Sequence, residues 1–256
     1  MDHAHLLELY DREERRDALL PDARREATAH VVRQINPSGR GSTILYSHLN
    51  EANAEKVIDE EIEYFNRLQL GFEWKVFDHD APADLRQRLE KRGLVLETPE
   101  AVMVLDLEAN SVILRPSTRP EVRRVSDPRE LVDVVSVQNE VWGEDHDCVV
   151  GRLAVEMELT PDKLSVYVAS AADLPVSTGW VRFSAHGKFA SLWGGSTLPA
   201  FRHRGFYTAL VQVRLAEAAR RGFRFVTVDA LPTSQPILEK RGFTFLTGAQ
   251  ACRWGE

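Results

Sequence analysis

The chain has 256 residues, of which 43% are hydrophobic and 28% charged, and its net charge is -7. This length permits one large domain or two small ones. No run of 18 apolar residues and no signal-peptide pattern is present, so we expect a cytoplasmic protein that does not bind membranes. The negative charge argues against nucleic-acid binding, because neutralising phosphates requires clustered Lys and Arg.

The two cysteines, Cys148 and Cys252, lack metal-ligand spacing, so neither a disulfide framework nor a metal site is expected. The acidic excess is confined to one part of the chain. Residues 1–118 hold 23 acidic and 15 basic residues, whereas residues 119–256 are nearly neutral.

The first half of the chain begins with patterns typical of strands. Residues 25–35 and 42–49 are predicted to form two strands joined by a turn at residues 36–41. Residues 50–68 are predicted to form a helix that begins near Asn50.

The segment from Leu70 to Asp106 has the same order of features as the segment from Arg221 to Trp254. Each has Gly-Phe, an extended stretch ending in Asp78 or Asp229, a loop with proline, and a helix closing on Leu-Glu-Lys-Arg-Gly before a last apolar strand. The matching glycines lie 149 to 151 residues apart. This order predicts a duplicated unit, in which the two aspartates have a structural role at a strand end.

The proline-bearing segment Leu107–Pro120 is predicted to link the two copies. A helix over residues 127–142 and a meander of three strands over residues 164–170, 176–185 and 189–198 follow it. Both halves therefore have an α/β pattern with a mostly antiparallel sheet.

The third strand of this meander leads into a basic loop that carries Arg202, Arg204 and Gly205, and a long apolar-striped helix follows directly. The first N–H groups of a helix have no partner inside it, and the helix dipole places partial positive charge there. A glycine lets the backbone approach an anion, and the arginines add charge. The loop is therefore predicted to hold a phosphate group.

The strand "ASLWGGSTL", the loop "RHRGFY" and the tail "TVDALPTSQPILEKRGF" resemble the acyl-coenzyme A loop and its surroundings in the GCN5-related N-acetyltransferase (GNAT) superfamily. The family pattern is RxxGxG/A before a long helix, and the resemblance covers residues 120–256 well. Tyr207 stands where the family usually has glycine or alanine. The resemblance implies an α/β fold of the α+β type, with two tandem GNAT-like domains, each a mixed, mostly antiparallel sheet flanked by helices.

The resemblance also implies that acetyl-CoA is the cosubstrate and that no metal is needed. Backbone N–H groups of residues 203–208 would bind the pyrophosphate, with the two arginines near the phosphates. The end of the preceding strand would pair with the pantetheine arm. The implied coenzyme-binding residues are Thr197, Leu198, Arg202, His203, Arg204, Gly205, Phe206, Tyr207 and Thr208.

At the matching place in the first copy, residues 49–61 contain no glycine, and Glu51 and Glu55 replace the positive charge. Carboxylates at a helix start stabilise that helix but repel a pyrophosphate. We therefore expect a degenerate GNAT-like domain over residues 1–110 and an acetyl-CoA-binding domain over residues 119–256.

The sequence evidence for the catalytic residues is weaker than that for the coenzyme loop. Many family members use as acid a tyrosine four residues before the final Gly-Phe, and that position is Leu238 here. Ser234 is a substitute acid or, equally, a helix N-cap. In the sequence "WGEDHD", Glu144 or His146 is a candidate base, the alternative being a polar turn at a helix end. Trp193 would line the acceptor cleft or belong to the core.

Together these features predict an N-acetyltransferase that moves an acetyl group from acetyl-CoA directly to a primary amine of a small molecule or peptide. The alternative, suggested by the missing tyrosine, is a non-catalytic acyl-CoA sensor or interaction protein. Either a monomer or a homodimer is compatible with two copies in one chain.

Overall fold

The structure is a computed structural model and describes residues 1–20, 23–36, 41–110, 121–143, 145–185 and 187–255. It divides into two compact units. The first comprises Met1–Met103, Asp229–Gln235 and Phe245–Glu256, and the second comprises Val104–Val228 and Pro236–Thr244. The chain therefore passes from one unit to the other four times.

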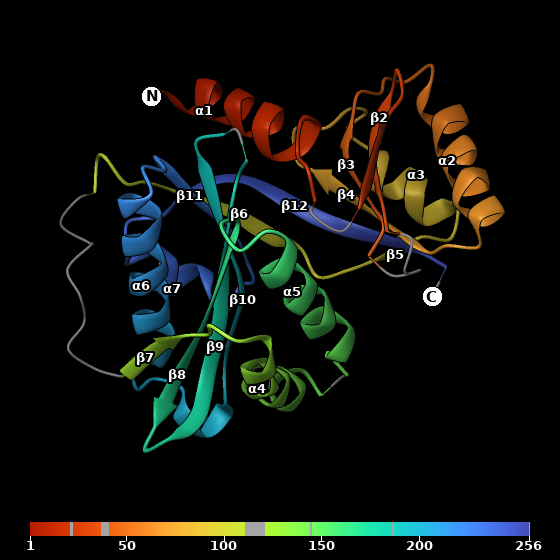
Figure 1. Cartoon of the computed structure of the whole chain (residues 1–256). Helices are drawn as coiled ribbons and strands as arrows, with labels where there is room; N and C mark the ends of the chain where they lie inside the picture. Colours follow the sequence, from red (N-terminus) through yellow and green to blue (C-terminus); the bar gives the residue numbers. More distant parts are fainter. Residues whose placement is uncertain (21–22, 37–40, 111–120, 144, 186, 256) are drawn as a thin grey trace. The chain divides into compact units, whose positions relative to one another are not determined.

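The first unit combines a sheet with helices from the N-terminal part of the chain (Figure 1). Its sheet has the strand order β1-β2-β3-β4-β12, and the β3–β4 pair is parallel. The elements are α1 (His3–Tyr10), a π-helix (Asp11–Arg16), β1 (Arg24–Ala27), β2 (Val31–Ile35), β3 (Thr43–Ser47), α2 (Ala54–Leu68), β4 (Phe72–Phe77), α3 (Leu85–Lys91) and β5 (Val95–Leu96), followed by the start of β6 (Glu100–Asp106).

The single strand predicted over residues 25–35 is wrong, because β1 and β2 are separate antiparallel strands. The Thr28 hydroxyl oxygen accepts hydrogen bonds from the N–H groups of His30 (3.1 Å) and Val31 (3.0 Å), so the chain reverses there. A threonine that captures nearby N–H groups makes such a turn without glycine or proline.

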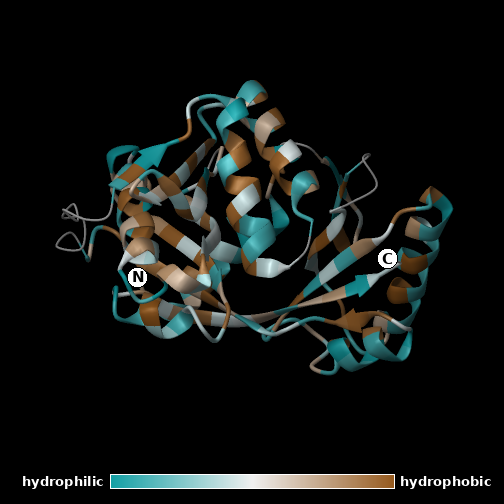
Figure 2. Ribbon diagram, turned by 90° about the horizontal axis from the view of Figure 1, so that it is seen from below, coloured by the Kyte–Doolittle hydropathy of each residue, from teal (hydrophilic) through white to brown (hydrophobic). Residues whose placement is uncertain are grey.

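Helix α2 forms because its apolar residues recur on one face, and that face packs against the sheet of the first unit. Phe65 of α2 is fully buried and stacks on Phe72 of β4, with ring centroids 4.3 Å apart. The helix ends at Gln69, whose φ of 56° is left-handed. Figure 2 shows hydrophobic and hydrophilic residues alternating along the long helices, as helices with one packed face require.

The second unit has the strand order β11-β10-β9-β8-β7. Helix α6 covers one face of this sheet, and α4 and α5 cover the other (Figure 1). The elements are β7 (Glu121–Arg124), a 3-10 turn (Pro128–Leu131), α4 (Val132–Trp142), α5 (Asp147–Leu159), β8 (Leu164–Ala171), β9 (Leu174–Phe183), β10 (Phe189–Thr197), a second 3-10 turn (Pro199–Phe201), α6 (Phe206–Arg220), β11 (Phe225–Ala230) and α7 (Gln235–Glu239). The chain then returns to the first unit with β12 (Thr244–Trp254).

The predicted repeat is present as two β–α–β–α segments, β3-α2-β4-α3 and β10-α6-β11-α7. In each, the two strands are parallel: Ile44 pairs with Trp74, and Ala190 pairs with Val226. The pairs β1–β2, β2–β3, β4–β12, β5–β12, β7–β8, β8–β9 and β9–β10 are antiparallel. The predicted fold class, a mixed and mostly antiparallel sheet flanked by helices, is confirmed.

The repeat alone does not indicate which strand completes each unit. In the first unit β4 pairs with β12, from Phe72 opposite Trp254 to Phe77 opposite Ala249. In the second unit the end of β6 lies beside β11, where the Leu107 N–H donates to the Arg224 carbonyl (2.8 Å). Each unit therefore takes its last strand from the other half of the sequence.

The predicted domain limits at residues 110 and 119 stay a prediction, because residues 111–120, with most of the predicted linker, lie outside the described residues. Helices α1 and α5 and the π-helix were not predicted from the sequence. Among the described residues, none of the helices has the length and apolar character needed to cross a bilayer.

Candidate functional site

Strand β10 contains an irregularity at two consecutive glycines. Its register with β9 shifts between Trp193 and Ser196, so Gly194 and Gly195 form a β-bulge. Gly194 has φ 58°, and a Cβ there would overlap the ring of Trp180. The parallel register with β11 covers only residues 189–191 of β10, so it ends before the bulge.

The basic loop follows β10 directly. Leu198 is buried and its N–H donates to the Val176 carbonyl (2.9 Å), which ties the end of the strand to β9. His203 (φ 61°) and Gly205 (φ 88°) are both left-handed, and these two reversals turn the chain into α6. Residues 202–205 are exposed.

The first backbone N–H groups of α6 have no acceptor inside the helix. Ala209 is the first helix residue whose N–H bonds back into the loop, to the Gly205 carbonyl (2.9 Å). Within the described part of the chain, the N–H groups of residues 203–208 have no hydrogen-bond acceptor. A row of free N–H groups at the positive end of a helix is the arrangement that binds an anion.

Arg202 precedes this row and Arg204 lies within it. The Arg202 Nε donates to the Thr197 carbonyl (3.2 Å), and the Arg204 guanidinium lies 5.1 Å from the centroid of the Phe201 ring. Neither arginine forms an ion pair with a carboxylate of the described residues. Both positive charges therefore remain available to an incoming anion.

Tyr207 is turned away from the exposed loop. A Cβ built on Gly195 would lie 2.8 Å from Tyr207 Cε2, so the ring packs against the bulge of β10. Burial raises the pKa of the Tyr207 hydroxyl. The neighbouring Thr208 is half-buried in the first turn of α6. The tyrosine thus leaves the row of N–H groups uncovered.

The candidate catalytic residues are not brought together among the described residues. Glu144 lies outside them. The neighbouring Asp145 carboxylate accepts the Asp147 N–H (2.8 Å) at the start of α5, and the His146 N–H donates to Asn139 Oδ1 (2.8 Å). This pattern agrees with the polar-turn interpretation of the cluster.

Ser234 belongs to the first unit, whereas the basic loop belongs to the second. The Ser234 hydroxyl donates to the Leu231 carbonyl (3.1 Å) in the turn before α7. Leu238, at the position of the family's tyrosine, is fully buried. The roles of Glu144 and Ser234 stay predictions.

Two tryptophans of the second unit are exposed rather than part of the core. Trp193 is 42% exposed and Trp142 is 48% exposed. The Trp193 Nε1 donates to Ser191 Oγ (2.8 Å), and the Trp142 Nε1 donates to Ser196 Oγ (3.0 Å). Because Ser191 and Ser196 lie on either side of the bulge in β10, the two indoles flank the glycine pair.

At the matching position of the first unit, Asn50 binds N–H groups at the start of α2. The Asn50 side-chain oxygen accepts the N–H groups of Ala52 (2.9 Å) and Asn53 (3.1 Å), and the Asn50 carbonyl accepts the Ala54 N–H (3.1 Å). Asn50 thus binds the N–H groups of the two residues before α2 and that of Ala54, the first residue of the helix. Glu51 precedes α2 and lies in the segment that leads into the helix.

Arg88 of α3 pairs with both Glu51 and Glu55, at 3.0 Å for Glu55. Because Arg88 also pairs with Asp84, it is shared by three carboxylates, and these pairs leave an excess of negative charge that disfavours a phosphate. The expectation that this helix start carries acidic groups in place of a phosphate cradle agrees with the contacts.

The first unit also has a bulge in β3, at Leu45, where the register with β2 shifts. Arg15 of the π-helix fills the space that extends from this bulge to the end of β4. Its Nε donates to the Leu45 carbonyl (3.1 Å), its Nη2 donates to Asp80 Oδ1 (2.7 Å), and its guanidinium carbon lies 3.8 Å from the Phe77 ring centroid. Arg15 is only 1% exposed.

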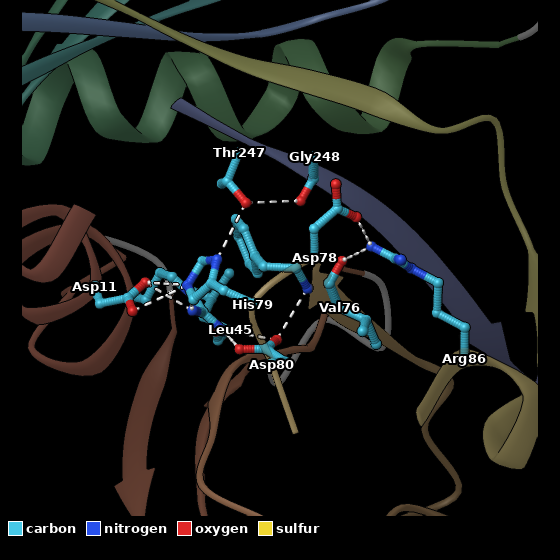
Figure 3. A network of polar contacts seen from close by, with 11 residues as sticks. Asp11, Leu45, Val76, Asp78, His79, Asp80, Arg86, Thr247 and Gly248 are labelled. Carbon is cyan, nitrogen blue, oxygen red and sulfur yellow. Dashed lines mark hydrogen bonds and ion pairs between the residues drawn. The ribbon is translucent and has the colours of Figure 1, made fainter. Parts of the chain in front are cut away.

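Figure 3 shows the polar network around this position. Asp11 Oδ1 accepts from Arg15 Nη1 (2.7 Å) and lies 3.0 Å from His79 Nε2, while His79 Nδ1 lies 3.0 Å from Thr247 Oγ1. Asp78 pairs with Arg86 (2.7 Å). The side chains thus fill the end of β4.

The repeated aspartates have structural partners, as predicted. Asp78 pairs with Arg86, and Asp229 pairs with Lys75 at 2.5 Å, within the first unit. Neither a disulfide nor a group of three or more metal-ligating side chains occurs among the described residues, where Cys148 is exposed and Cys252 is buried.

No protein-family model matches the sequence, and no curated protein matches it. Among solved structures, a GCN5-related N-acetyltransferase from Kribbella flavida is similar, with a TM-score of 0.72 and 12% identity over 98% of this chain and 95% of that one. A GCN5-related N-acetyltransferase from Sphaerobacter thermophilus has a TM-score of 0.57 and 14% identity, over 90% of this chain and 81% of that one.

A tandem GNAT protein from the clavulanic acid biosynthesis pathway is similar as well. Its TM-score is 0.61 and its identity 12%, over 93% of this chain and 85% of that one. The protein therefore has the GNAT acetyltransferase fold. More specifically, it has the tandem form of that fold, with two repeats in one chain.

Proposed function

We propose that the protein is an N-acetyltransferase that binds acetyl-CoA at the start of α6 and transfers the acetyl group to a primary amine of a small molecule or peptide. The observation that carries this proposal is the row of free N–H groups at residues 203–208, with Arg202 before it and Arg204 within it, in one unit only. The shared fold with solved acetyltransferases supports it.

In the proposed reaction, the neutral amine nitrogen attacks the thioester carbonyl, an N–C bond forms and the C–S bond breaks. The amine loses one proton to a base and the departing thiolate takes one proton, so the charges balance. The base would come from the segment after α4, where Glu144 and His146 lie. Ser234 is the candidate proton donor.

Isothermal titration with acetyl-CoA tests the binding step. We expect the double variant Arg202→Ala/Arg204→Ala to bind about 10–100-fold more weakly, since each charge-assisted hydrogen bond contributes about 1.5–3 kcal/mol before solvent screening. Arg129→Ala is a matched control, because Arg129 is an exposed arginine of the same unit whose partner is Asp127. No binding by folded wild-type protein would exclude this function.

The second candidate function is a non-catalytic acyl-CoA sensor. It is favoured by the buried Leu238 at the tyrosine position and by the Ser234 hydroxyl, which already donates to Leu231. Release of free thiol from acetyl-CoA across a set of amines separates the two candidates. Tight coenzyme binding without turnover for any amine would favour the sensor.

A further inference from the structure

Tyr207 carries a hydroxyl group that the described part of the chain leaves unbound. The side chain is half-buried in the first turn of α6, and its hydroxyl forms no hydrogen bond with any of the described residues. A tyrosine hydroxyl that is partly buried normally has a hydrogen-bond partner. Here the partner has to be solvent or a bound molecule.

The ring of Tyr207 lies against the bulge of β10. A Cβ built on Gly195 would lie 2.8 Å from Tyr207 Cε2 and 3.7 Å from Cζ, the ring carbon that carries the hydroxyl. Because the hydroxyl oxygen is bonded to Cζ, it lies beside the bulge and not in the exposed loop.

A buried positive charge reaches β10 close to the same place. Arg214 follows Tyr207 by seven residues, so both side chains leave α6 on the same face. Its Nη1 donates to the carbonyls of Trp193 (3.2 Å) and Trp180 (3.1 Å), which places the guanidinium two residues from Gly195 along the strand. Arg214 is only 1% exposed.

Arg214 has no counter-charge among the described residues. Its remaining hydrogen bond runs from Nε to the Leu210 carbonyl (2.9 Å), so it is held by backbone carbonyls and pairs with no carboxylate of that part of the chain. Burial lowers its pKa to about 10, and it therefore stays charged near neutral pH. A buried cation without a counter-charge is costly, and a negative charge that forms next to it is stabilised.

The two side chains together suit a hydroxyl that gives up its proton. Burial raises the pKa of the Tyr207 hydroxyl, while the positive charge of Arg214 opposes that rise. The hydroxyl is therefore protonated at neutral pH and able to donate, and the phenolate left after donation is the form that Arg214 stabilises.

The proposed function brings a leaving group to this hydroxyl. The pyrophosphate would lie at residues 203–208 and the pantetheine arm beside Thr197 and Leu198, so the coenzyme would run back along β10 toward Gly195. The thioester at the end of this arm would then lie at the bulge, next to the ring of Tyr207.

We infer that Tyr207 is the proton donor of the proposed reaction, which binds the thioester sulfur through its hydroxyl and protonates that sulfur as the C–S bond breaks, while Arg214 stabilises the phenolate that remains. This inference rests on the proposed function. The proton that the amine loses returns to the phenolate through solvent, so protons and charges balance. The other candidate donor, the Ser234 hydroxyl, is already bonded to the Leu231 carbonyl (3.1 Å).

The first test compares Tyr207→Phe with wild type. Phenylalanine removes the hydroxyl and keeps the ring that packs on Gly195. Tyr167→Phe is the matched control, because Tyr167 is a buried tyrosine of the same unit whose hydroxyl donates to Glu217 of α6.

We expect Tyr207→Phe to keep the acetyl-CoA dissociation constant within about threefold and to lower the single-turnover rate of acetyl transfer about 100-fold or more, as the loss of a general acid does. Tyr167→Phe should leave this rate unchanged, even where it lowers Tm. Titration calorimetry measures the binding, and rapid mixing with the best amine measures the rate.

A second test follows the contact with sulfur and needs no turnover. Free coenzyme A and desulfo-coenzyme A, which lacks the sulfur atom, are titrated at pH 8.5 into wild type and both variants. We expect the preference for coenzyme A over the desulfo compound to fall about 3–30-fold in Tyr207→Phe, as the loss of one hydrogen bond to a partly ionised thiol predicts. The preference should be unchanged in Tyr167→Phe.

The outcomes distinguish the two proposals. If wild type binds acetyl-CoA and turns over while Tyr207→Phe keeps the rate, Tyr207 is not the donor and the proposed function stands. A slower rate with an unchanged preference for coenzyme A over the desulfo compound would also overturn the assignment, because the hydroxyl then does not contact the sulfur. If wild type binds neither acetyl-CoA nor coenzyme A, the proposed function itself fails and this inference fails with it.

Discussion

Tyr207 shows how one side chain can depart from the family pattern without closing the coenzyme loop. The pattern has glycine or alanine there, but the ring packs on Gly195, where β10 carries no side chain. The bulge glycine and the loop tyrosine are therefore complementary: the absence of one Cβ makes room for the other residue's ring.

This complementarity predicts the effect of Gly195→Ala. The new Cβ would lie 2.8 Å from Tyr207 Cε2, so the ring must move. We expect a loss of about 1–3 kcal/mol in stability, typical of overpacking, and weaker acetyl-CoA binding. The double variant Gly195→Ala/Tyr207→Ala should recover most of the binding, and titration calorimetry would show whether it does.

Trp193 is the second residue whose environment indicates a function. Its indole N–H is satisfied by Ser191, and the Arg182 guanidinium lies 5.3 Å from its ring centroid, yet the side chain remains 42% exposed. An exposed aromatic face beside the bulge suits an acceptor that carries an apolar group or a cationic amine.

We expect Trp193→Ala to raise the KM for the best amine acceptor about 5–30-fold, corresponding to about 1–2 kcal/mol of lost contact, while the acetyl-CoA dissociation constant stays unchanged. Steady-state kinetics with varied amine at saturating acetyl-CoA measures this. An unaltered acceptor KM would remove Trp193 from the acceptor site.

At the scale of elements, α2 and α6 occupy the same position in the two repeats, but the segments that precede them differ. In the second unit the N–H groups of residues 203–208 have no acceptor among the described residues, whereas in the first unit Asn50 binds the N–H groups of residues 52–54, and Arg15 occupies the end of β4. The helix itself is required by the fold, and only its preceding loop decides whether an anion can bind.

The contrast predicts one acetyl-CoA bound per chain. Calorimetric titration should give a stoichiometry near one, and the variant Arg202→Ala/Arg204→Ala should weaken that single site without exposing another. A stoichiometry of two would mean that the first unit binds coenzyme despite Arg15 and Asn50.

At the scale of the whole molecule, stability should depend on pH through Glu14 of the π-helix. Burial, with smaller contributions from Glu13 and Asp229, raises its pKa from 4.5 to about 7. The folded state therefore favours the protonated carboxyl. The resulting stabilisation is fully present below the unfolded value of 4.5 and is lost as the pH rises through 7.

We expect the Tm of wild type to fall between about pH 5 and pH 8, and that of Glu14→Gln to fall less, because the amide stays neutral. Thermal unfolding monitored by circular dichroism at both pH values checks this. Equal pH dependence in the two proteins would show that Glu14 does not carry the effect.

Much of the fold could be predicted because its signals are local. The repeated Gly-Phe and Leu-Glu-Lys-Arg-Gly segments mark the β–α–β–α units, and Arg202, Arg204 and Gly205 mark the loop. What could not be predicted depends on pairing between distant segments, such as β4 with β12, which no local periodicity encodes.

The same reason explains what the sequence missed at the site. Arg15 and Leu45 are 30 residues apart, and Gln138 and Gly194 are 56 apart, so nothing in either neighbourhood indicates that they are bonded. The one available signal was the consecutive glycines Gly194 and Gly195 in a strand, which suggest a bulge or a close approach.

The first unit takes its last strand, β12, from the end of the chain, and this affects how the chain can fold during its synthesis. Since β4 pairs with β12, the sheet of the first unit keeps an unpaired edge until residues 245–256 have left the ribosome, long after residues 1–103. An N-terminal domain usually folds while the rest is being made. Here the sheet of the first unit can be completed only after the end of the chain has been made, and until then the edge of β4 stays unpaired.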